Sequence, residues 1–195
     1  MSHDAIIIGG SFAGLSAAIY IARARRSVCV IDGGSPRNRF AAHSHGFFAQ
    51  DGSSPGAMLA TARAQVAAYP TTKLLEGRAI RATGKQDGFR VELATGEVLE
   101  ARRLVLAFGI SDELPAIPGI AERWGSSVLH CPYCHGYEFA DRRLGVLYTS
   151  PGSLHQATLV TEWGPTTLYL NGAVPEGKEE KEMLEGLRKR GAAIE

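Results

Sequence analysis

The seven residues HCPYCHG at positions 130–136 place two cysteines two residues apart, with a histidine on each outer side. Cys131 and Cys134 at this spacing fit a metal site, a glutaredoxin-like redox site or a redox disulfide coupled to another cofactor. Structural zinc commonly takes four ligands from two such pairs, and the chain contains one pair among its three cysteines. A glutaredoxin is a much shorter domain with the motif near its start. The elements around the motif must therefore decide between these chemistries.

Composition limits the class of protein. The chain has 195 residues, of which 45% are hydrophobic, and a net charge of +1. This balance is typical of a globular protein and gives no electrostatic reason to expect a nucleic-acid or membrane partner. No apolar run approaches the roughly 20 residues of a membrane span, and MSHDAIIIGG has no signal-peptide pattern. Few cysteines, odd in number, favour a reducing, cytoplasmic setting.

The first 33 residues predict a βαβ unit. An apolar strand at 5–8 is followed by a glycine-rich turn, an alanine-rich helix at about 15–25 and a second apolar strand at 28–31. This arrangement is typical of a dinucleotide-binding fold, in which the pyrophosphate lies at the helix N-terminus.

The turn, GGSFAG, carries the dinucleotide fingerprint at its first and third glycines. These are Gly9 and Gly14, while Ser11 takes the place of the second glycine. Asp32, which closes the second strand, is expected to accept a hydrogen bond from a ribose hydroxyl. An ordinary βαβ crossover with a glycine turn is the alternative.

The middle of the chain predicts a helix, a set of short strands and a linker. Residues 55–69 are alanine-rich and end at Pro70. The stretch 73–106 predicts short strands: LLEGRAI, then FRVELATGE with a turn at Thr95-Gly96, forming a β-meander, and then RRLVLAFG as a buried strand ending in Gly109. The proline-rich residues 112–120 predict a linker.

A second α/β unit is expected after the cysteine pair. The predicted order is a strand (RRLGVLY), a turn (TSPG), a helix (SLHQATLVTEWG), a strand (TTLYLNG), a charged helix at about 176–190 and the start of another strand (AAIE). Because the sequence stops within this unit, we expect it to be a fragment of a longer chain.

Three other residues have chemistry of their own. His43 and His45 have no acidic or cysteine partner at ligand spacing, so we expect surface or cofactor-adjacent histidines. Cys29, within the strand SVCVI, is expected to be a small core residue.

Four features in order carry a family resemblance: the GGSFAGLSAA turn, the acid after the second strand, LVLAFG followed by LPAIPG, and a CxxC before a second Rossmann-like strand. The chain resembles the low-molecular-weight thioredoxin reductase family of FAD-dependent pyridine nucleotide-disulfide oxidoreductases, over nearly its whole length. It is most similar to the CPYCHG-type branch, which includes dithiol oxidases. The implied fold is α/β: a Rossmann-like FAD-binding domain with a β-meander at 1–112, then a second Rossmann-like, nicotinamide-type domain at 118–195 that carries the CxxC. A homodimer is also implied.

The resemblance also implies roles for individual residues. Cys134 would face the flavin and Cys131 would meet the substrate, which is a small dithiol or disulfide or a thioredoxin-like protein. His135 stands where these enzymes carry an acidic proton donor, and an imidazole can do the same work. Ala107-Phe108-Gly109 matches an Ala-Thr-Gly motif of the family, with Phe108 in place of the threonine. The expected FAD contacts are Gly9, Gly10, Ser11, Ala13, Gly14, Asp32, Gly33, Ala79, Ala107 and Gly109.

Departures from the family pattern weaken the case for NADPH as a second cofactor. Tyr148 and Ser150 stand where a nicotinamide site has glycines, and YLNGAVPEG lacks the arginines that hold a 2′-phosphate. Electrons could instead pass from a substrate dithiol to FAD and then to oxygen. A divergent loop that still binds NADPH, or a non-enzymatic flavin redox sensor, are the alternatives. The Gly-Asp motif that completes FAD binding in the family is not in these residues.

Overall fold

The computed structural model describes residues 2–195, which form two compact units. Unit 1 is the chain up to Ser44 together with Gly52–Ile120, and unit 2 is His45–Asp51 together with Ala121–Glu195. Each unit has its own sheet and its own hydrophobic core. The two units are therefore described separately.

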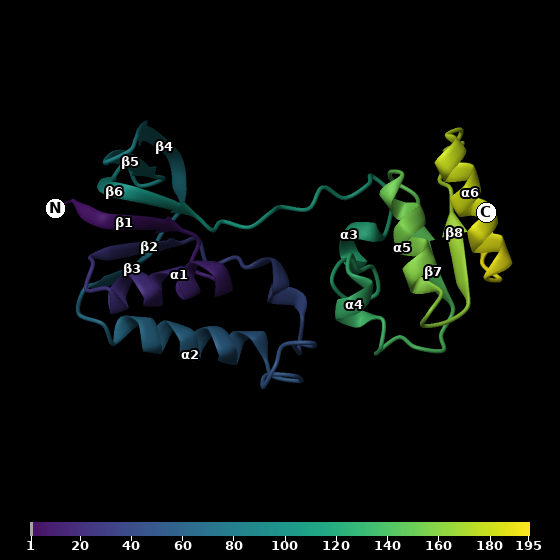
Figure 1. Cartoon of the computed structure of the whole chain (residues 1–195), viewed down its shortest axis with the longest axis horizontal. Helices are drawn as coiled ribbons and strands as arrows, with labels where there is room; N and C mark the ends of the chain where they lie inside the picture. The colour runs from purple at the N-terminus through teal and green to yellow at the C-terminus, as the bar shows by residue number, and fades with distance from the viewer. Residues whose placement is uncertain (1) are drawn as a thin grey trace. The chain divides into compact units, whose positions relative to one another are not determined.

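Unit 1 is built around a six-stranded sheet with the order β3-β2-β1-β6-β5-β4. The first four of these strands are mutually parallel, and the last two continue the sheet in antiparallel fashion. Helices α1 and α2 pack together on one face of the parallel strands (Figure 1). The elements are β1 (His3–Ile8), α1 (Phe12–Arg23), β2 (Val28–Asp32), the short 3₁₀ helix η1 (Arg37–Phe40), α2 (Pro55–Ala67), β3 (Thr72–Glu76), β4 (Ala79–Lys85), β5 (Gly88–Leu93) and β6 (Val98–Leu106).

The alternation of side chains between the two faces of the sheet explains why residues 5–8 of β1 and 28–31 of β2 are all apolar. Ile7 and Val30 point into the core beneath α1 and α2, whereas Ile6 and Cys29 point into the second core on the opposite face. A strand covered on both faces needs a continuous apolar run. Cys29 is fully buried, which confirms its expected place in the core, and burial raises the pKa of its thiol.

Two strand predictions in this region were wrong in detail. The stretch LLEGRAI is two strands, because the chain leaves the parallel sheet after Glu76 and enters the antiparallel part at Ala79. The final strand is not a separate buried element. β6 pairs with β5 and with β1 along one continuous strand, it ends at Leu106 rather than at Gly109, and Leu106 is 61% exposed.

Unit 2 contains a three-stranded parallel sheet with the order β7-β8-β9. Its core is formed by apolar residues of the sheet and of α5 and α6, which also contact each other. The short helix α4 lies before the sheet in sequence and contacts α5 (Figure 1). The elements are α3 (Ile120–Arg123), α4 (Pro132–His135), β7 (Leu144–Leu147), α5 (Gly152–Val160), β8 (Thr166–Tyr169), α6 (Lys178–Lys189) and β9 (Ala193–Ile194).

Candidate active site

The turn between β1 and α1 is the predicted pyrophosphate site. Gly9 has φ +113°, and a Cβ at this position would collide with the carbonyl oxygen of Ala107, so glycine is required twice over. A Cβ on Gly14 would collide with the carbonyl oxygen of Gly9. Because Gly14 has no side chain, α1 can start close against the end of β1. These two glycines therefore fix the path of the turn.

The N-terminus of α1 has the features of an anion site. Its first turn holds no acidic residue, and the hydroxyl of the N-cap residue Ser11 makes no capping bond. The first N–H groups of a helix have no partner within the helix and attract negative charge. Ala13, in the first turn, is exposed, so its small side chain leaves this end open.

Asp32 closes β2 beside the same turn. Its Oδ1 accepts a hydrogen bond from the backbone N–H of Gly34 at 2.9 Å, and its Oδ2 forms an ion pair with Arg63 of α2. A Cβ on Gly10 would lie 2.5–2.7 Å from the atoms of the Asp32 side chain. Gly10 is thus the residue that allows the acid to approach the turn.

Other predicted cofactor residues lie at strand ends of unit 1. The N–H of Ala107 donates to the carbonyl oxygen of Ile8 at 2.8 Å, which ties the end of β6 to the end of β1. Gly109 has φ +70° just beyond it, and Phe108 between them is 65% exposed. Gly33 follows Asp32 directly, whereas Ala79 begins β4 in the antiparallel part of the sheet.

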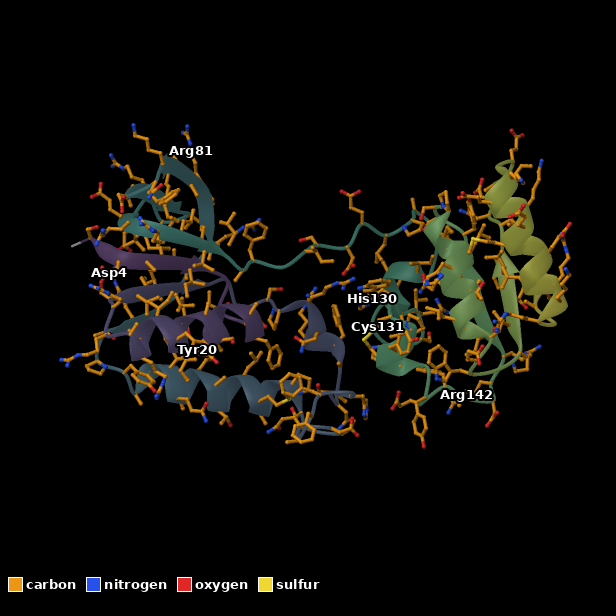
Figure 2. All side chains as sticks on the ribbon, viewed as in Figure 1. Asp4, Tyr20, Arg81, His130, Cys131 and Arg142 are labelled. Atoms are coloured by element: carbon orange, nitrogen blue, oxygen red, sulfur yellow. A yellow bond between two sulfur atoms is a disulfide. The ribbon has the colours of Figure 1, made fainter. Side chains whose placement is uncertain are left out.

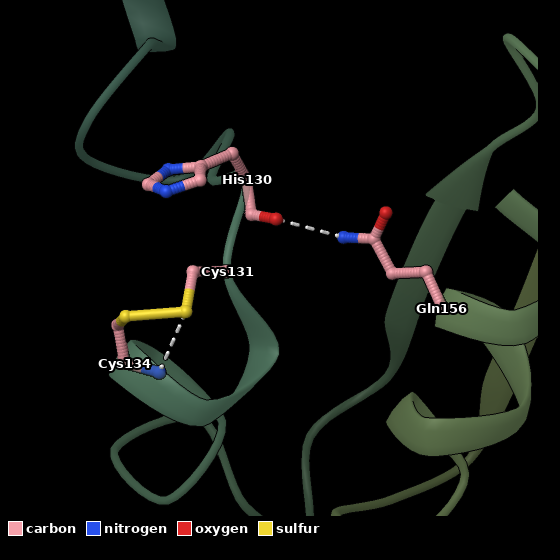
Figure 3. Close-up of a disulfide and its surroundings, with 4 residues drawn as sticks. All are labelled: His130, Cys131, Cys134 and Gln156. Carbon is pink, nitrogen blue, oxygen red and sulfur yellow. Dashed lines mark hydrogen bonds between the residues drawn. A yellow bond between two sulfur atoms is a disulfide. The ribbon is translucent and has the colours of Figure 1, made fainter. Parts of the chain in front are cut away.

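The redox pair lies in unit 2, around the four-residue helix α4. Cys131 and Cys134 form a disulfide with their Cα atoms 5.4 Å apart (Figure 3). Cys131 is the N-cap of α4, and its Sγ accepts a hydrogen bond from the backbone N–H of Cys134 at 3.2 Å. Pro132 occupies the first helical position, where its missing N–H costs nothing. Cys134 is exposed and Cys131 is partly exposed, so the disulfide is accessible from the surface of this unit.

Helix α5 and the residues just after it support residues 130–136, which carry the two cysteines. This support was not predicted from the sequence. Gln156 of α5 donates from Nε2 to the carbonyl oxygen of His130 at 3.0 Å (Figure 3). The ring of Trp163 meets the ring of Tyr133 edge to face, with centroids 5.5 Å apart. A Cβ on Gly136 would lie 2.6 Å from the Trp163 ring, so only glycine fits there. Neither Gln156 nor Trp163 belongs to a recognisable motif, and only the fold brings them to the cysteines.

The histidines around the cysteines lie in different places. His135 is the last residue of α4 and directly follows Cys134. His130 precedes Cys131 (Figure 2), and its ring centroid lies 6.1 Å from that of Trp124. His45, also in unit 2, lies between two carboxylates, with Nδ1 3.6 Å from Asp51 and Nε2 3.4 Å from Glu138. The carboxylate of Glu138 is remote from His45 in sequence, so no ligand spacing in the sequence could indicate this neighbour. In unit 1, His43 Nδ1 lies 3.1 Å from the carbonyl oxygen of Gly52.

The loop from β7 to α5 is the predicted nicotinamide site. The hydroxyl of Ser153, which is only 5% exposed, accepts hydrogen bonds from the backbone N–H of Thr149 at 3.0 Å and of Ser150 at 3.3 Å. These N–H groups belong to the loop that would approach a pyrophosphate in a dinucleotide-binding βαβ unit. The chain's own hydroxyl thus takes two donors that a phosphate would need.

A carboxylate from α6 also reaches this loop. Tyr148 donates from its phenolic oxygen to Oε1 of Glu180 at 2.6 Å, and this hydrogen bond raises the pKa of Tyr148. The same carboxylate accepts the N–H of Gly177 through Oε2 at 3.1 Å. A carboxylate in this position opposes the approach of an anionic ligand.

Residues 2–195 contain neither a metal-binding cluster nor a membrane-spanning helix. No group of three or more His, Cys, Asp or Glu side chains in this part of the chain is arranged to hold a metal ion. None of the helices in the described part of the chain is long and apolar enough to span a membrane.

Comparison with known proteins gives the family. The profile of the pyridine nucleotide-disulphide oxidoreductase family matches residues 3–149, which is most of the chain. The chain therefore belongs to this family, whose thioredoxin reductase-like members bind FAD. The residues of unit 1 fit this cofactor, because the open N-terminus of α1 and the carboxylate of Asp32 flank one turn.

One curated protein and two solved structures illustrate the similarity. The chain is 40% identical over 178 residues to thioredoxin reductase tcpT of Claviceps purpurea, an alignment that covers 87% of this chain and 56% of that protein. The crystal structure of an oxidoreductase from Agrobacterium tumefaciens matches with a TM-score of 0.93 and 48% identity, over 100% of this chain and 65% of that one. The structure of HlmI matches with a TM-score of 0.89 and 41% identity, over 100% and 61%. The chain thus spans a little over half to two thirds of these relatives.

Proposed function

We propose that the chain is part of an FAD-dependent thiol–disulfide oxidoreductase in which the Cys131–Cys134 disulfide exchanges with a substrate dithiol or disulfide. The observation that carries this proposal is the accessible disulfide across one turn of α4, in a chain of the pyridine nucleotide-disulphide oxidoreductase family. A buried structural disulfide would not meet a substrate, whereas this one can. The FAD supplies a two-electron couple that accepts electrons from, or returns them to, the cysteine pair.

The proposed exchange divides the work between the two cysteines. A substrate thiolate attacks the Sγ of Cys131, so that a mixed disulfide forms and the sulfur of Cys134 leaves as a thiolate. The second substrate thiolate then attacks the substrate sulfur of the mixed disulfide, which releases the oxidised substrate and the Cys131 thiolate. Two protons pass from the substrate to the protein or to solvent, and His135, next to Cys134, is proposed to handle one of them. The reverse sequence reduces a disulfide.

Cofactor binding is assigned to unit 1. The N–H groups at the start of α1, from Ser11 to Gly14, would hold the pyrophosphate, and Asp32 would hold the ribose. Gly9 and Gly10 leave room for Ala107 and Asp32 beside the turn, and both are proposed, with Gly33, to contact the cofactor through their backbone. Ala79, Ala107 and Gly109 are the remaining positions proposed to contact the cofactor through their backbone.

The experiment uses the full-length protein of which this sequence is part. Purified protein should be yellow, contain FAD and oxidise or reduce a dithiol such as dithiothreitol catalytically, whereas a Cys131→Ser/Cys134→Ser protein should keep its FAD and lose the turnover. A colourless protein that takes up no FAD would refute the cofactor assignment. A yellow protein whose double variant turns over dithiols at the wild-type rate would refute the role of the disulfide, and a yellow protein without any turnover would favour a flavin redox sensor.

A second function is favoured by Ser153: a dithiol oxidase that uses oxygen and does not take electrons from NADPH. Its net reaction converts a dithiol and O₂ into a disulfide and hydrogen peroxide. The observation in its favour is that the hydroxyl of Ser153 already bonds the N–H groups of Thr149 and Ser150. Under nitrogen, a dithiol should bleach the bound flavin, and admitting oxygen should restore its colour. Rapid bleaching by NADPH would instead identify a reductase.

A further inference from the structure

The ion pair between Arg63 and Asp32 joins α2 to the predicted ribose site. Arg63 lies in the middle of α2, and its guanidinium meets Oδ2 of Asp32, while Oδ1 accepts the N–H of Gly34. The Asp32 side chain is only 15% exposed and the Arg63 side chain 34% exposed. The carboxylate is thus held on both oxygens, one by its own loop and one by a neighbouring helix.

The position of Asp32 means that its negative charge affects ligand binding at the turn between β1 and α1. The side chain packs directly against Gly10, so a negative charge lies beside the turn whose N–H groups would bind a pyrophosphate. Unbalanced, that charge would repel the anionic ligand. The first turn of α1 contains no acidic residue, so Asp32 is the carboxylate that this turn must accommodate. A cation paired with Asp32 reduces the repulsion and leaves the free lone pairs of the carboxylate available to a ribose hydroxyl.

The packing of α2 against α1 explains why Arg63 can reach Asp32. Leu59 and Ala62, on the same helix, pack against the core beneath the sheet, which fixes α2 against α1. Arg63 directly follows Ala62 and extends from this anchored face to the end of β2. A guanidinium suits this place, because its planar fork holds a carboxylate in one orientation.

We propose that Arg63 is a positioning residue for FAD: it orients the Asp32 carboxylate and balances its charge, and it acts on the cofactor only through Asp32. This inference rests on the proposed role of Asp32 in the ribose site. It adds a residue that the dinucleotide fingerprint does not contain.

The test is a double-mutant cycle on cofactor affinity. Apo full-length protein is titrated with FAD, and the quenching of flavin fluorescence gives the dissociation constant for the wild type, Asp32→Ala, Arg63→Ala and the double variant. ADP-ribose, detected by calorimetry, serves as a second probe that lacks the flavin. We expect Arg63→Ala to weaken FAD binding about tenfold, the range for a lost charge-assisted contact. Arg63→Lys keeps the charge but lacks the planar fork, so it should recover only part of the loss.

The corners of the cycle separate the possible outcomes. In the Asp32→Ala background, Arg63→Ala should cause no further loss, since its partner is gone. An equal loss in both backgrounds would overturn the proposal and show that Arg63 binds the nucleotide itself. Wild-type affinity in Arg63→Ala would also overturn it. If Asp32→Ala binds FAD normally, the ribose role of Asp32 and the role of Arg63 both fall, while the dithiol activity and its dependence on Cys131 and Cys134 would remain intact.

Two controls exclude a loss through folding. Arg63→Gln keeps the length of the side chain, and its circular dichroism and thermal melting should match the wild type while its FAD affinity falls like that of Arg63→Ala. Arg23→Ala removes another arginine from the same helix pair, one that donates to the hydroxyl of Tyr69 at 3.2 Å rather than to a carboxylate. Its FAD affinity should stay at the wild-type value. A similar loss in Arg23→Ala would show that the effect is a general one on the packing of α1 and α2 and would overturn the proposal.

Discussion

The hydroxyl of Ser153 accepts the backbone N–H of Thr149 at 3.0 Å and thereby closes the loop between β7 and α5 from within. In a dinucleotide-binding unit, a loop of this kind keeps its N–H groups for the ligand. Here the same hydroxyl also bonds the N–H of Ser150. The second α/β unit therefore has the strand–loop–helix order of a dinucleotide-binding unit, but two N–H groups of its loop are bonded to the chain's own hydroxyl.

Ser153→Ala should lower the free energy of unfolding by about 1–2 kcal/mol. The substitution removes the acceptor of two partly buried N–H groups and leaves them without a bond. Urea denaturation followed by circular dichroism measures the change. Ser126→Ala, in an exposed turn, is the matched control and should cost less than about 0.5 kcal/mol. Unchanged stability in Ser153→Ala would show that water satisfies the loop and that the hydroxyl does not close it.

The sequence predicted the sheet of unit 1 well where hydrophobic pattern decides the structure. Ile6 and Ile7 face opposite cores, so the apolar run signals a strand covered on both sides. The pattern could not show that β6 continues from the meander into the parallel sheet, because pairing partners are set by tertiary contacts. It also missed the break at Gly77 and Arg78, where two short strands follow one another without a strong turn signal.

The candidate site also has residues that the sequence could predict and residues that it could not. The fingerprint glycines and the cysteine pair were visible, since each requires particular residues at a fixed spacing. Arg63, Gln156 and Trp163 were invisible, because each acts on a residue at least 26 positions away and none has a local signature. The pairing of His45 with Glu138 escaped for the same reason, as the segment His45–Asp51 packs within unit 2 although its neighbours in sequence belong to unit 1.

His135→Ala should slow thiol–disulfide turnover by about 10²–10⁴-fold, the usual contribution of a general acid or base. FAD content should stay the same, because the residue lies in α4 of unit 2 and the proposed cofactor contacts lie in unit 1. Steady-state rates with dithiothreitol measure the effect, with His155→Ala on the exposed face of α5 as the control. Wild-type rates in His135→Ala would assign the proton to another group or to water.

Trp163→Ala should loosen the redox helix and make its disulfide easier to reduce. The ring supports α4 through Tyr133 and closes against Gly136, so its loss leaves space behind the helix. We expect faster reduction of the disulfide by dithiothreitol and a loss of about 1–3 kcal/mol in unfolding free energy, less than for a fully buried tryptophan. Trp163→Phe should restore the reduction rate, because a phenyl ring can still meet Tyr133. Tyr137→Ala, at an 83% exposed side chain, should leave it unchanged. An unaltered rate in Trp163→Ala would show that α4 holds its shape without this support.

Single cysteine variants should show that the two sulfurs have different roles. Cys131 caps α4 and accepts the N–H of Cys134, so the two sulfurs have different surroundings in the same turn. One sulfur cannot be both dry against a flavin ring and open to a bulky partner, so we expect the two cysteines to have divided roles. The resemblance to thioredoxin reductases implies that Cys134 serves the flavin and Cys131 serves the substrate. Cys131→Ser should leave a Cys134 thiolate against oxidised flavin and give a long-wavelength absorption band. Cys134→Ser should lack this band and still form a mixed disulfide with substrate through Cys131, detected by mass spectrometry. A band in Cys134→Ser but not in Cys131→Ser would reverse the assignment, and full activity in both variants without any band would remove the pair from the mechanism.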